Sequence, residues 1–261
     1  KNLQASTYGM ATVNNLSSVD VTLNWMPLEH VASLVMFHLT EVCLGCEQIH
    51  VAQSRILQDP LSWIDLLETY KVTATWAPNF AYGLVNDQLA NGTNRSWDLS
   101  AVRWMGNGAE AVVGKTARQF LQHLIPYGLS PTAISPGYGM SETCSGVVHS
   151  RQFSLETTYD SDTFVTVGRP IPGTALRIVD DVDRLLPEGA IGRLQVKGLT
   201  VMAGYYLPFD QATDLDTDLN AAVFTDDGWF NTGDLGYLKS GALTITGRQK
   251  DVIILNGINY Y

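Results

Sequence analysis

The sequence is poor in cysteine, in basic residues and in long apolar runs. Three cysteines among 261 residues are too few for a disulfide framework, which favours a reducing compartment. The richest apolar stretch, residues 31–44, is interrupted by a histidine and a glutamate and is shorter than a membrane span. Because no signal-peptide pattern is present either, we predict a cytoplasmic protein with no membrane partner.

Acidic residues outnumber basic ones. Lys and Arg total 16 against 26 Asp and Glu, a net charge of −10, which argues against nucleic acid as a partner. Hydrophobic residues make up 45% of the chain, which excludes an intrinsically disordered protein. A chain of 261 residues is long enough for one large domain or two modest ones around a buried core.

The first part of the chain alternates between strand-like and helix-like hydrophobic patterns, which predicts α/β layering. Short apolar runs predict strands at residues 21–25, 48–51, 72–76, 101–105 and 132–135. Apolar residues at helical spacing predict helices over residues 31–42, 60–70, 78–89 and 115–125. Gly45 is expected to end the first of these helices, and Asp59 to cap the second.

After about Gly168, proline and glycine punctuate short alternating runs such as residues 176–179 and 193–196, which is typical of a β-rich unit. We therefore predict a layered α/β sheet over residues 1–168 and a small β-barrel-like unit over residues 169–247. A solvated loop is predicted for the acidic stretch that contains Asp214, Asp216, Asp218, Asp226 and Asp227.

Residues 135–143, Ser-Pro-Gly-Tyr-Gly-Met-Ser-Glu-Thr, form the most specific segment of the sequence. Glycines allow backbone N–H groups to approach an anion, and Tyr138 between them is able to stack on a planar base. Ser141 and Glu142 supply a hydroxyl and a carboxylate that suit a phosphate and a divalent cation. Taken alone, the segment fits an ordinary tight turn with a packed tyrosine equally well.

Two later segments carry an acid and a base at strand ends. Asp234, in Thr-Gly-Asp, is placed to accept hydrogen bonds from both hydroxyls of a ribose. Arg248, in Gly-Arg-Gln-Lys-Asp, is able to reach ribose or phosphate with its fork of donors. Each residue on its own also fits a charge on a surface hairpin.

In this order, the segments resemble the adenylate-forming superfamily, which includes acyl-CoA synthetases, fatty acyl-AMP ligases and the adenylation domains of nonribosomal peptide synthetases. The resemblance covers nearly the whole chain. Residues 24–30 look like the substrate-side segment of the family. Residues 106–110, Gly-Asn-Gly-Ala-Glu, look like its adenine-side loop, in the form found in fatty acyl-AMP ligases and in loading domains of polyketide and peptide hybrid assembly lines.

The resemblance implies that a carboxylate attacks the α-phosphorus of ATP to give an acyl-adenylate and pyrophosphate, with Mg²⁺ as cofactor. Ser141 would then contact the α-phosphate and Glu142 would hold Mg²⁺. Lys250 would be the hinge in residues 248–261, about which a C-terminal domain rotates. The adenosine would contact Gly108, Ala109, Glu110, Tyr138, Gly139, Met140, Asp234 and Arg248.

The resemblance also implies an acyl pocket, in which His30 is a candidate catalytic residue and lining residue. A hydrogen-bonded histidine at a helix start is the alternative for His30. The other lining candidates, which suit a fatty or aryl-alkanoic chain, are Val31, Ala32, Trp76, Phe80, Met105, Gly137 and Met140. Relatives that activate amino acids usually carry an aspartate in the segment matching residues 28–32. This chain has Glu29 and His30 there, so we expect an acid without an α-amino group, unless Glu29 reaches an amine.

The acceptor of the acyl group follows from the same resemblance. Fatty acyl-AMP ligases transfer it to the phosphopantetheine of a carrier protein, whereas synthetases use free coenzyme A. Residues 143–167 look too few for the insertion of stand-alone fatty acyl-AMP ligases. We therefore expect a loading adenylation domain with a carrier-protein partner, and an acyl-CoA synthetase is the alternative.

The chain is expected to be a piece of a longer protein. By the resemblance, the phosphate loop would precede Lys1, and the lysine that stabilises the transferring phosphate would follow Tyr261. Loss of such preorganised contacts costs on the order of a hundredfold in rate, so the piece alone is expected to adenylate weakly or not at all.

Three features of the sequence bear on other classes of protein. Residues 106–111 also fit the dinucleotide fingerprint, but no acidic residue lies between Ala111 and Ser141 to bind a ribose, which argues against an NAD-dependent oxidoreductase. Cys43 and Cys46 have no second pair of ligands and are expected to be small buried residues. A noncatalytic scaffold fragment is a further alternative, which the binding of AMP would exclude.

Overall fold

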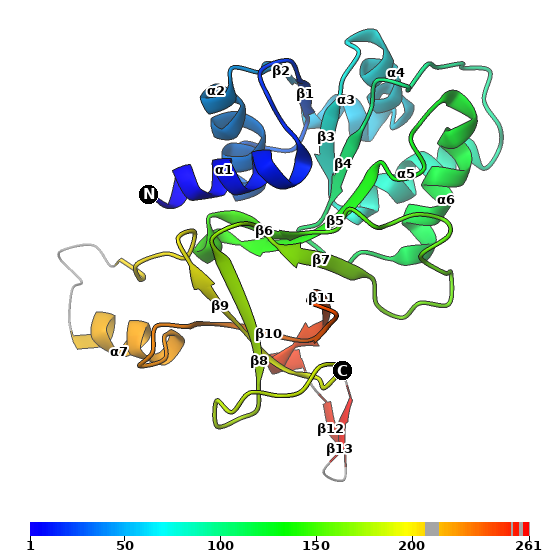
Figure 1. Cartoon of the computed structure of the whole chain (residues 1–261). Coiled ribbons are helices and arrows are strands. Elements are labelled where there is room, and N and C mark those ends of the chain that lie inside the picture. The colour runs from blue at the N-terminus through cyan, green and yellow to red at the C-terminus, as the bar shows by residue number, and fades with distance from the viewer. Residues whose placement is uncertain (207–213, 252, 256–257, 261) are drawn as a thin grey trace.

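The computed structural model describes residues 1–206, 214–251, 253–255 and 258–260, and for residues 214–218 and 251–260 it describes the backbone only. A single sheet of 11 strands runs through most of the described chain, in the order β2-β1-β3-β4-β5-β6-β7-β11-β10-β9-β8 (Figure 1). Its first five strands pair in parallel: β1 Val21–Asn24, β2 Glu47–His50, β3 Ala74–Ala77, β4 Trp104–Asn107 and β5 Ile134–Met140.

Helices cover both faces of this parallel part (Figure 1). One face packs against α4 Leu61–Thr69, α5 Asn79–Leu89 and α6 Gly114–Leu124. The other carries α1 Asn2–Asn14, η1 Ala32–Leu39 and α2 Thr40–Leu44. Shorter helical segments are α3 Gln53–Gln58, η2 Ile125–Tyr127 and η3 Ser141–Thr143. The α/β fold expected from the sequence is therefore confirmed.

The pairing changes from parallel to antiparallel at β5. The segment expected to be a glycine loop is the second half of this strand, which pairs with β6 Ser145–His149. The sheet then continues through β7 Thr166–Pro170 into antiparallel strands β8 Thr174–Val179, β9 Gly192–Gly198, β10 Phe230–Lys239 and β11 Ala242–Arg248. The two expected units thus share one sheet, whose order is open from β2 to β8 in the described chain.

Three local expectations differ from the structure. Asp59 does not cap α4 with its side chain, because its carboxylate pairs with Arg95 at 2.9 Å. The helix α1 is not anticipated, since its sequence lacks a clear apolar stripe. Residues expected in an acidic loop form α7 Asp214–Val223, and the following Asp226 and Asp227 lie exposed in a turn.

The helix expected over residues 31–42 is present, but its buried face differs from the expected one. Along η1 it is a π-helix, in which the Thr40 N–H donates to the Val35 carbonyl. Such i→i+5 bonds widen each turn, so that a 3.6-residue pattern does not select the buried face correctly. Val42 is exposed, and so is Cys43, contrary to expectation. Gly45 ends the helix as expected, with φ 78°.

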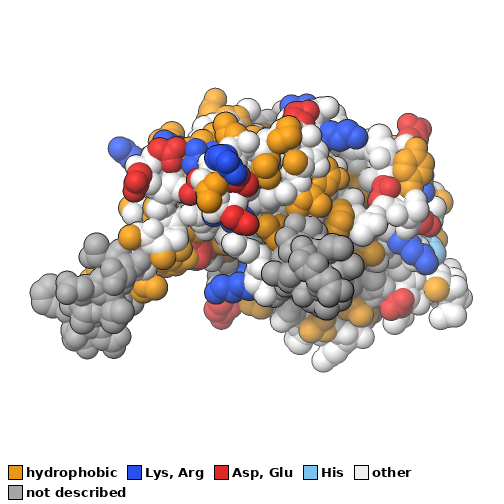
Figure 2. Space-filling view, turned by 90° about the horizontal axis from the view of Figure 1, so that it is seen from below, with side chains coloured by type: hydrophobic (Ala, Val, Ile, Leu, Met, Phe, Trp, Pro, Cys, Tyr) orange, Lys and Arg blue, Asp and Glu red, His pale blue; other side chains and the backbone are white. Residues whose placement is uncertain are grey.

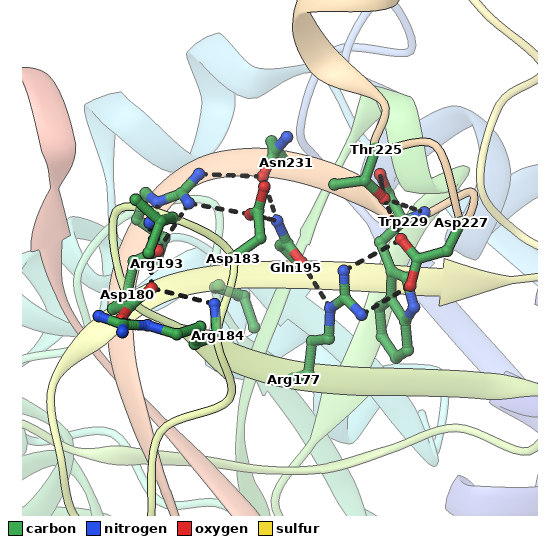
Figure 3. Close-up of polar contacts among 12 residues, drawn as sticks. Arg177, Asp180, Asp183, Arg184, Arg193, Gln195, Thr225, Asp227, Trp229 and Asn231 are labelled. Carbon is green, nitrogen blue, oxygen red and sulfur yellow. Dashed lines mark hydrogen bonds and ion pairs between the residues drawn. The ribbon is translucent and has the colours of Figure 1, made fainter.

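A polar network ties the loops to the antiparallel strands β8, β9 and β10 (Figure 3). Arg177 donates to Asp227 at 2.9 Å and lies 4.4 Å over the ring of Trp229. Gln195 stands between Arg177 and Asn231 and hydrogen-bonds to both. Because Asp227 belongs to this network, part of the acidic stretch has a structural partner. The network holds the chain that leads into β10, on which Asp234 lies.

The chain ends in the short turn η4 Gln249–Asp251 and the hairpin of β12 Ile253–Leu255 and β13 Ile258–Tyr260. Lys250, the expected hinge, is exposed in η4, while residues 252, 256–257 and 261 of the expected hinge segment lie outside the described residues.

Among the helices of the described residues, none has the length and apolar character needed to cross a membrane. On the face seen in Figure 2, basic side chains lie in small groups beside acidic and apolar ones.

Gly168 in β7 provides a test of this sheet. It has φ 107°, and a Cβ atom there would lie 2.0 Å from the carbonyl oxygen of His149 in β6. We expect Gly168→Ala to lower the free energy of unfolding by about 3 kcal/mol or more, because both the backbone strain and the overlap oppose the methyl group. Urea denaturation measures the change.

Gly189→Ala is the matched control. Gly189 also has a positive φ, 82°, but no atom lies within 4 Å of the point that a Cβ would occupy, so we expect a loss of only about 1 kcal/mol. Equal losses in the two variants would contradict the close approach of β6 and β7.

Candidate active site

A cavity of about 330 Å³ lies at the carboxyl edge of the parallel strands, where β5 turns antiparallel. Ligands of open α/β sheets bind at this kind of edge. Most of the residues that the sequence nominates line the cavity: His30, Val31, Ala32, Trp76, Gly108, Ala109, Gly137, Tyr138, Gly139, Met140, Ser141, Glu142 and Arg248.

One wall of the cavity is aromatic. The indoles of Trp76 and Trp104, from neighbouring strands, both pack on the ring of Phe37, at centroid distances of 6.1 and 5.5 Å. His30 contacts Trp76 and is exposed, whereas His149 contacts Trp104 and is 5% exposed. The wall therefore runs from an open end at His30 to a closed end at His149.

His30 has two contacts that correspond to its two expected roles. Its Nδ1 accepts a hydrogen bond of 3.1 Å from the Ala32 N–H, as a histidine at a helix start would. Its ring also lines the cavity. The hydrogen bond fixes the imidazole at the open end of the aromatic wall.

Tyr138 and Asp234 meet although they are distant in the sequence. The Tyr138 hydroxyl donates to Asp234 Oδ2 at 2.6 Å, and Arg248 Nε lies 3.1 Å from Asp234 Oδ1. Asp234 and Arg248 are direct partners across β10 and β11. Burial raises the pKa of Tyr138 well above its ordinary value, and the charge of Asp234 raises it further. The tyrosine therefore stays protonated and remains a donor at neutral pH.

Asp234 is 5% exposed and does not itself line the cavity. It lies directly behind Tyr138 and Arg248, which do. A buried carboxylate needs hydrogen-bond donors, and here the Tyr138 hydroxyl and the Arg248 guanidinium supply them. The arrangement presents three groups that suit a nucleoside: a phenol ring, a carboxylate and a guanidinium.

Three of the seven described non-glycine residues with a positive φ angle lie at or next to the cavity. Ala109, Cys144 and Ser145 are non-glycine residues with positive φ angles of 66, 56 and 81°. Such conformations cost of order 1–3 kcal/mol each and are typical of binding sites. Ala109 follows β4, and the other two residues follow η3, so the strain marks both edges of the expected nucleotide site.

The donor set suits Mg²⁺ bound together with a nucleotide. Glu142 supplies one carboxylate at the cavity, and no group of three metal-binding side chains occurs in the described part of the chain. Mg²⁺ is commonly held by one or two carboxylates together with substrate phosphates and water.

Asn107 also lines the cavity, and its buried Oδ1 has no described hydrogen-bond partner, as suits an acceptor for a ligand N–H.

Besides Asp234 and Lys250, three nominated residues lie outside the cavity lining. Met105 is fully buried in the core beneath α4, α5 and α6, because it follows Trp104 in β4 and neighbouring strand residues face opposite sides. Phe80 is 40% exposed and packs on Trp25. Glu110 Oε1 accepts from the Phe80 N–H at 2.6 Å and so caps the start of α5.

Other lining residues are absent from the sequence prediction, namely Met36, Trp104, Ser135, Ser145, Gly146 and His149. Trp104 was detectable in principle, since it precedes Met105 and pairs in register with the Ala74 end of β3, which places it on the face of Trp76. His149 had no such signal. It reaches the cavity only because β6 folds back along β5, where it pairs with Gly137.

His149 is a buried histidine whose ring nitrogens make no hydrogen bond of good geometry among the described residues, although the Gly146 backbone lies close to Nε2. Burial lowers its pKa to about 4, partly opposed by the backbone of Gly146. The ring is therefore neutral at pH 7. The Trp104 Nε1 donor is also buried and lacks a described partner. The closed end of the cavity thus holds polar groups but no fixed charge.

A parallel sheet whose carboxyl edge holds a cavity lined by a phenol and a guanidinium, with a buried carboxylate directly behind both, is typical of a nucleotide-binding class of α/β enzyme. Comparison with known proteins is consistent with this class and specifies the family. A family model described as AMP-binding enzyme matches residues 1–206. The chain belongs to this family, within the adenylate-forming superfamily.

Two curated relatives are fungal. The chain is 36% identical to the nonribosomal peptide synthetase apvA of Aspergillus terreus, over 98% of this chain and 27% of the relative. It is 38% identical to the microperfuranone synthase of Emericella nidulans, over 97% of this chain and 26% of the relative. The chain therefore spans about a quarter of the length of these proteins.

Solved structures share the fold over the whole chain. The adenylation domain of a keto acid-selecting NRPS module, bound to a keto acyl adenylate, is 43% identical, with a TM-score of 0.90 over 100% of this chain and 52% of that one. McyG A-PCP, complexed with phenylalanyl-adenylate, is 43% identical, with a TM-score of 0.91 over 100% of this chain and 39% of that one. A fatty acyl-adenylate ligase from L. pneumophila is 26% identical, with a TM-score of 0.83, over 96% and 47% of the chains.

The buried His149 gives a pH-dependent contribution to stability. Its pKa is about 4 in the folded protein against an ordinary value of 6.5, so the unfolded chain binds the proton first as the pH falls. The contribution is present above pH 6.5 and is lost between pH 6.5 and 4, up to about 3 kcal/mol. We expect the free energy of unfolding to fall less over this range in His149→Phe than in the wild type.

Urea denaturation at several pH values compares the two proteins. Burial raises the pKa of Glu41 to about 8, which makes stability fall as the pH rises, but this contribution is common to both proteins and cancels in the difference. Parallel pH profiles for wild type and His149→Phe would show that the histidine is solvated instead.

Proposed function

We propose that the chain forms the nucleotide and acid-binding part of an adenylation domain, which activates a carboxylic acid with ATP as an acyl-adenylate. The observation that carries the proposal is the convergence of Tyr138, Asp234 and Arg248 beside a cavity that extends along an aromatic wall. One end of the cavity suits an adenosine, and the other suits an acyl group. An adenylate joins two such groups through one phosphate.

The residues of this chain would bind and orient the reactants. Tyr138 would stack on the adenine, with Gly108 and Ala109 along its edge, and Asp234 and Arg248 would hold the ribose. Ser141 would donate to the α-phosphate, and Glu142 would hold Mg²⁺. When bound, the cation neutralises charge on the phosphate oxygens, which is the main electrostatic requirement of such transfers. Holding the two reactants in line supplies much of the remaining rate enhancement.

The acid is proposed to lack an α-amino group. Glu29, which alone in the substrate-side segment had the charge to pair with an ammonium, is exposed and lies outside the cavity lining. A buried ammonium without a partner is strongly disfavoured. The two indoles favour an aryl-alkanoic acid over a straight fatty chain. The unpaired polar groups of Trp104 and His149 further favour an acyl group with a neutral oxygen, such as a 2-oxo acid.

The acceptor is proposed to be the phosphopantetheine of a carrier protein. The similarity to the adenylation domain of an NRPS module and to an A-PCP protein supports this acceptor over free coenzyme A. An acyl-CoA synthetase remains the alternative function, and a carrier domain encoded next to this chain would distinguish the two.

Asp234→Asn tests the nucleotide site. The ribose hydroxyls would lose charge-assisted hydrogen bonds worth about 1.5–3 kcal/mol, so we expect AMP to bind about 10- to 100-fold more weakly. Isothermal titration calorimetry of the 261-residue chain measures the affinity. Asp226→Asn, at an exposed aspartate, is the matched control and should bind AMP like the wild type. A wild-type chain that binds neither AMP nor an acyl-adenylate analogue would support the scaffold alternative.

Sulfamoyl-adenosine analogues test the acid. We expect the 3-phenylpropanoyl and phenylpyruvoyl analogues to bind at least about 10-fold more tightly than the phenylalanyl analogue, because only the last brings an unpaired ammonium into the cavity. The comparison keeps the aryl group and the nucleoside constant. A preference for the phenylalanyl analogue would overturn the proposed substrate class.

A further inference from the structure

A short segment after β9 reaches back to the expected metal ligand. The Met202 N–H donates to the backbone carbonyl of Glu142 at 2.8 Å, which fixes the segment beside η3. Three residues further on, the Tyr205 hydroxyl donates to Glu142 Oε1 at 2.8 Å. Two contacts from one segment therefore hold both the backbone and the side chain of the same glutamate.

Hydrogen bonds to α7 fix the backbone position of Tyr205. The side chain of Asn220 accepts from the Tyr205 N–H at 2.7 Å and donates to the Tyr205 carbonyl at 3.1 Å. Gly204 packs against Asn220 so closely that a Cβ at Gly204 would lie 2.8 Å from Asn220 Oδ1. Its φ of 153° also disfavours other residues. The backbone of Tyr205 is thus held at its N–H and at its carbonyl by Asn220.

The hydroxyl contact leaves one oxygen of Glu142 for another partner. Tyr205 occupies Oε1, and a tyrosine hydroxyl is protonated at neutral pH and donates without adding charge. A carboxylate that accepts one hydrogen bond from the protein is restricted in rotation while it keeps its negative charge. Hydrogen bonds of this kind to metal-binding carboxylates commonly contribute 10- to 100-fold to metal affinity.

We propose that Tyr205 is a positioning residue, which orients the Glu142 carboxylate for Mg²⁺ bound with the nucleotide. The proposal rests on the proposed function, because Glu142 is there assigned to the cation. It adds that α7 and the segment after β9, which lie outside the cavity lining, belong to the metal site through a chain of contacts from Asn220 to Tyr205 to Glu142.

Tyr205→Phe removes the hydroxyl and keeps the ring. We expect the Mg²⁺ concentration that half-saturates the enhancement of ATP binding to rise 10- to 100-fold. ATP affinity in EDTA should stay within about twofold of the wild type, since the adenosine contacts are untouched. Calorimetric titrations of ATP into the 261-residue chain, across a series of MgCl₂ concentrations and in EDTA, measure both quantities.

Tyr206→Phe is the matched control. It makes the same change one residue further on, at a side chain that is 85% exposed, and should alter neither quantity. Unchanged Mg²⁺ dependence in Tyr205→Phe would overturn the proposal, and so would an equal loss of ATP affinity in EDTA, which would make the hydroxyl merely structural. A wild-type chain that binds no ATP in either condition would instead overturn the proposed function, and with it the inference.

Discussion

The hydrogen bond between Tyr138 and Asp234 is the contact on which the site depends. It joins β5, where the parallel part of the sheet ends, to β10 in the antiparallel part. Because the two strands are far apart in the sequence, the bond forms only when β6, β7 and β11 are paired between them. The proposed nucleotide site therefore depends on the whole sheet, and a substitution at Gly168 would act on it through strand pairing rather than through contact with a ligand.

The sequence is sufficient to predict what local patterns determine. The parallel strands and the helices α4, α5 and α6 follow from hydrophobic period, and the end of the helix before β2 follows from a glycine signal at Gly45. The buried face of η1 could not be predicted, because a π-helix does not follow the 3.6-residue period. The expected cap at Asp59 is wrong for another reason: its carboxylate pairs with Arg95. The Glu110 carboxylate likewise has a tertiary partner, the start of α5, and local propensity does not register either contact.

Side-chain direction separates the lining residues that were predictable from those that were not. Trp104 and Met105 are neighbours in one strand, and a choice of register alone decides which of them faces the cavity. Tyr138, Ser141 and Glu142 form a compact motif of an aromatic ring, a hydroxyl and a carboxylate. These residue types indicate a nucleotide and a cation as ligands, so the sequence alone nominates them as site residues. Tyr205 and His149 carry no such motif. Their roles depend on distances to Glu142 and to Trp104 that only the folded chain shows.

Several buried polar atoms at the cavity have no hydrogen-bond partner among the described residues, and this has an energetic meaning. Asn107, Trp104 and His149 each leave a buried polar atom without a described partner, at a cost of about 1–3 kcal/mol per group. A protein tolerates such groups where a ligand completes their hydrogen bonds, since ligand binding then stabilises the fold by mass action. A hydrocarbon acyl chain would leave the two groups at the closed end unpaired. An acyl group with a neutral oxygen there would bind more tightly for the same buried area, which is why the proposed substrate carries such an oxygen.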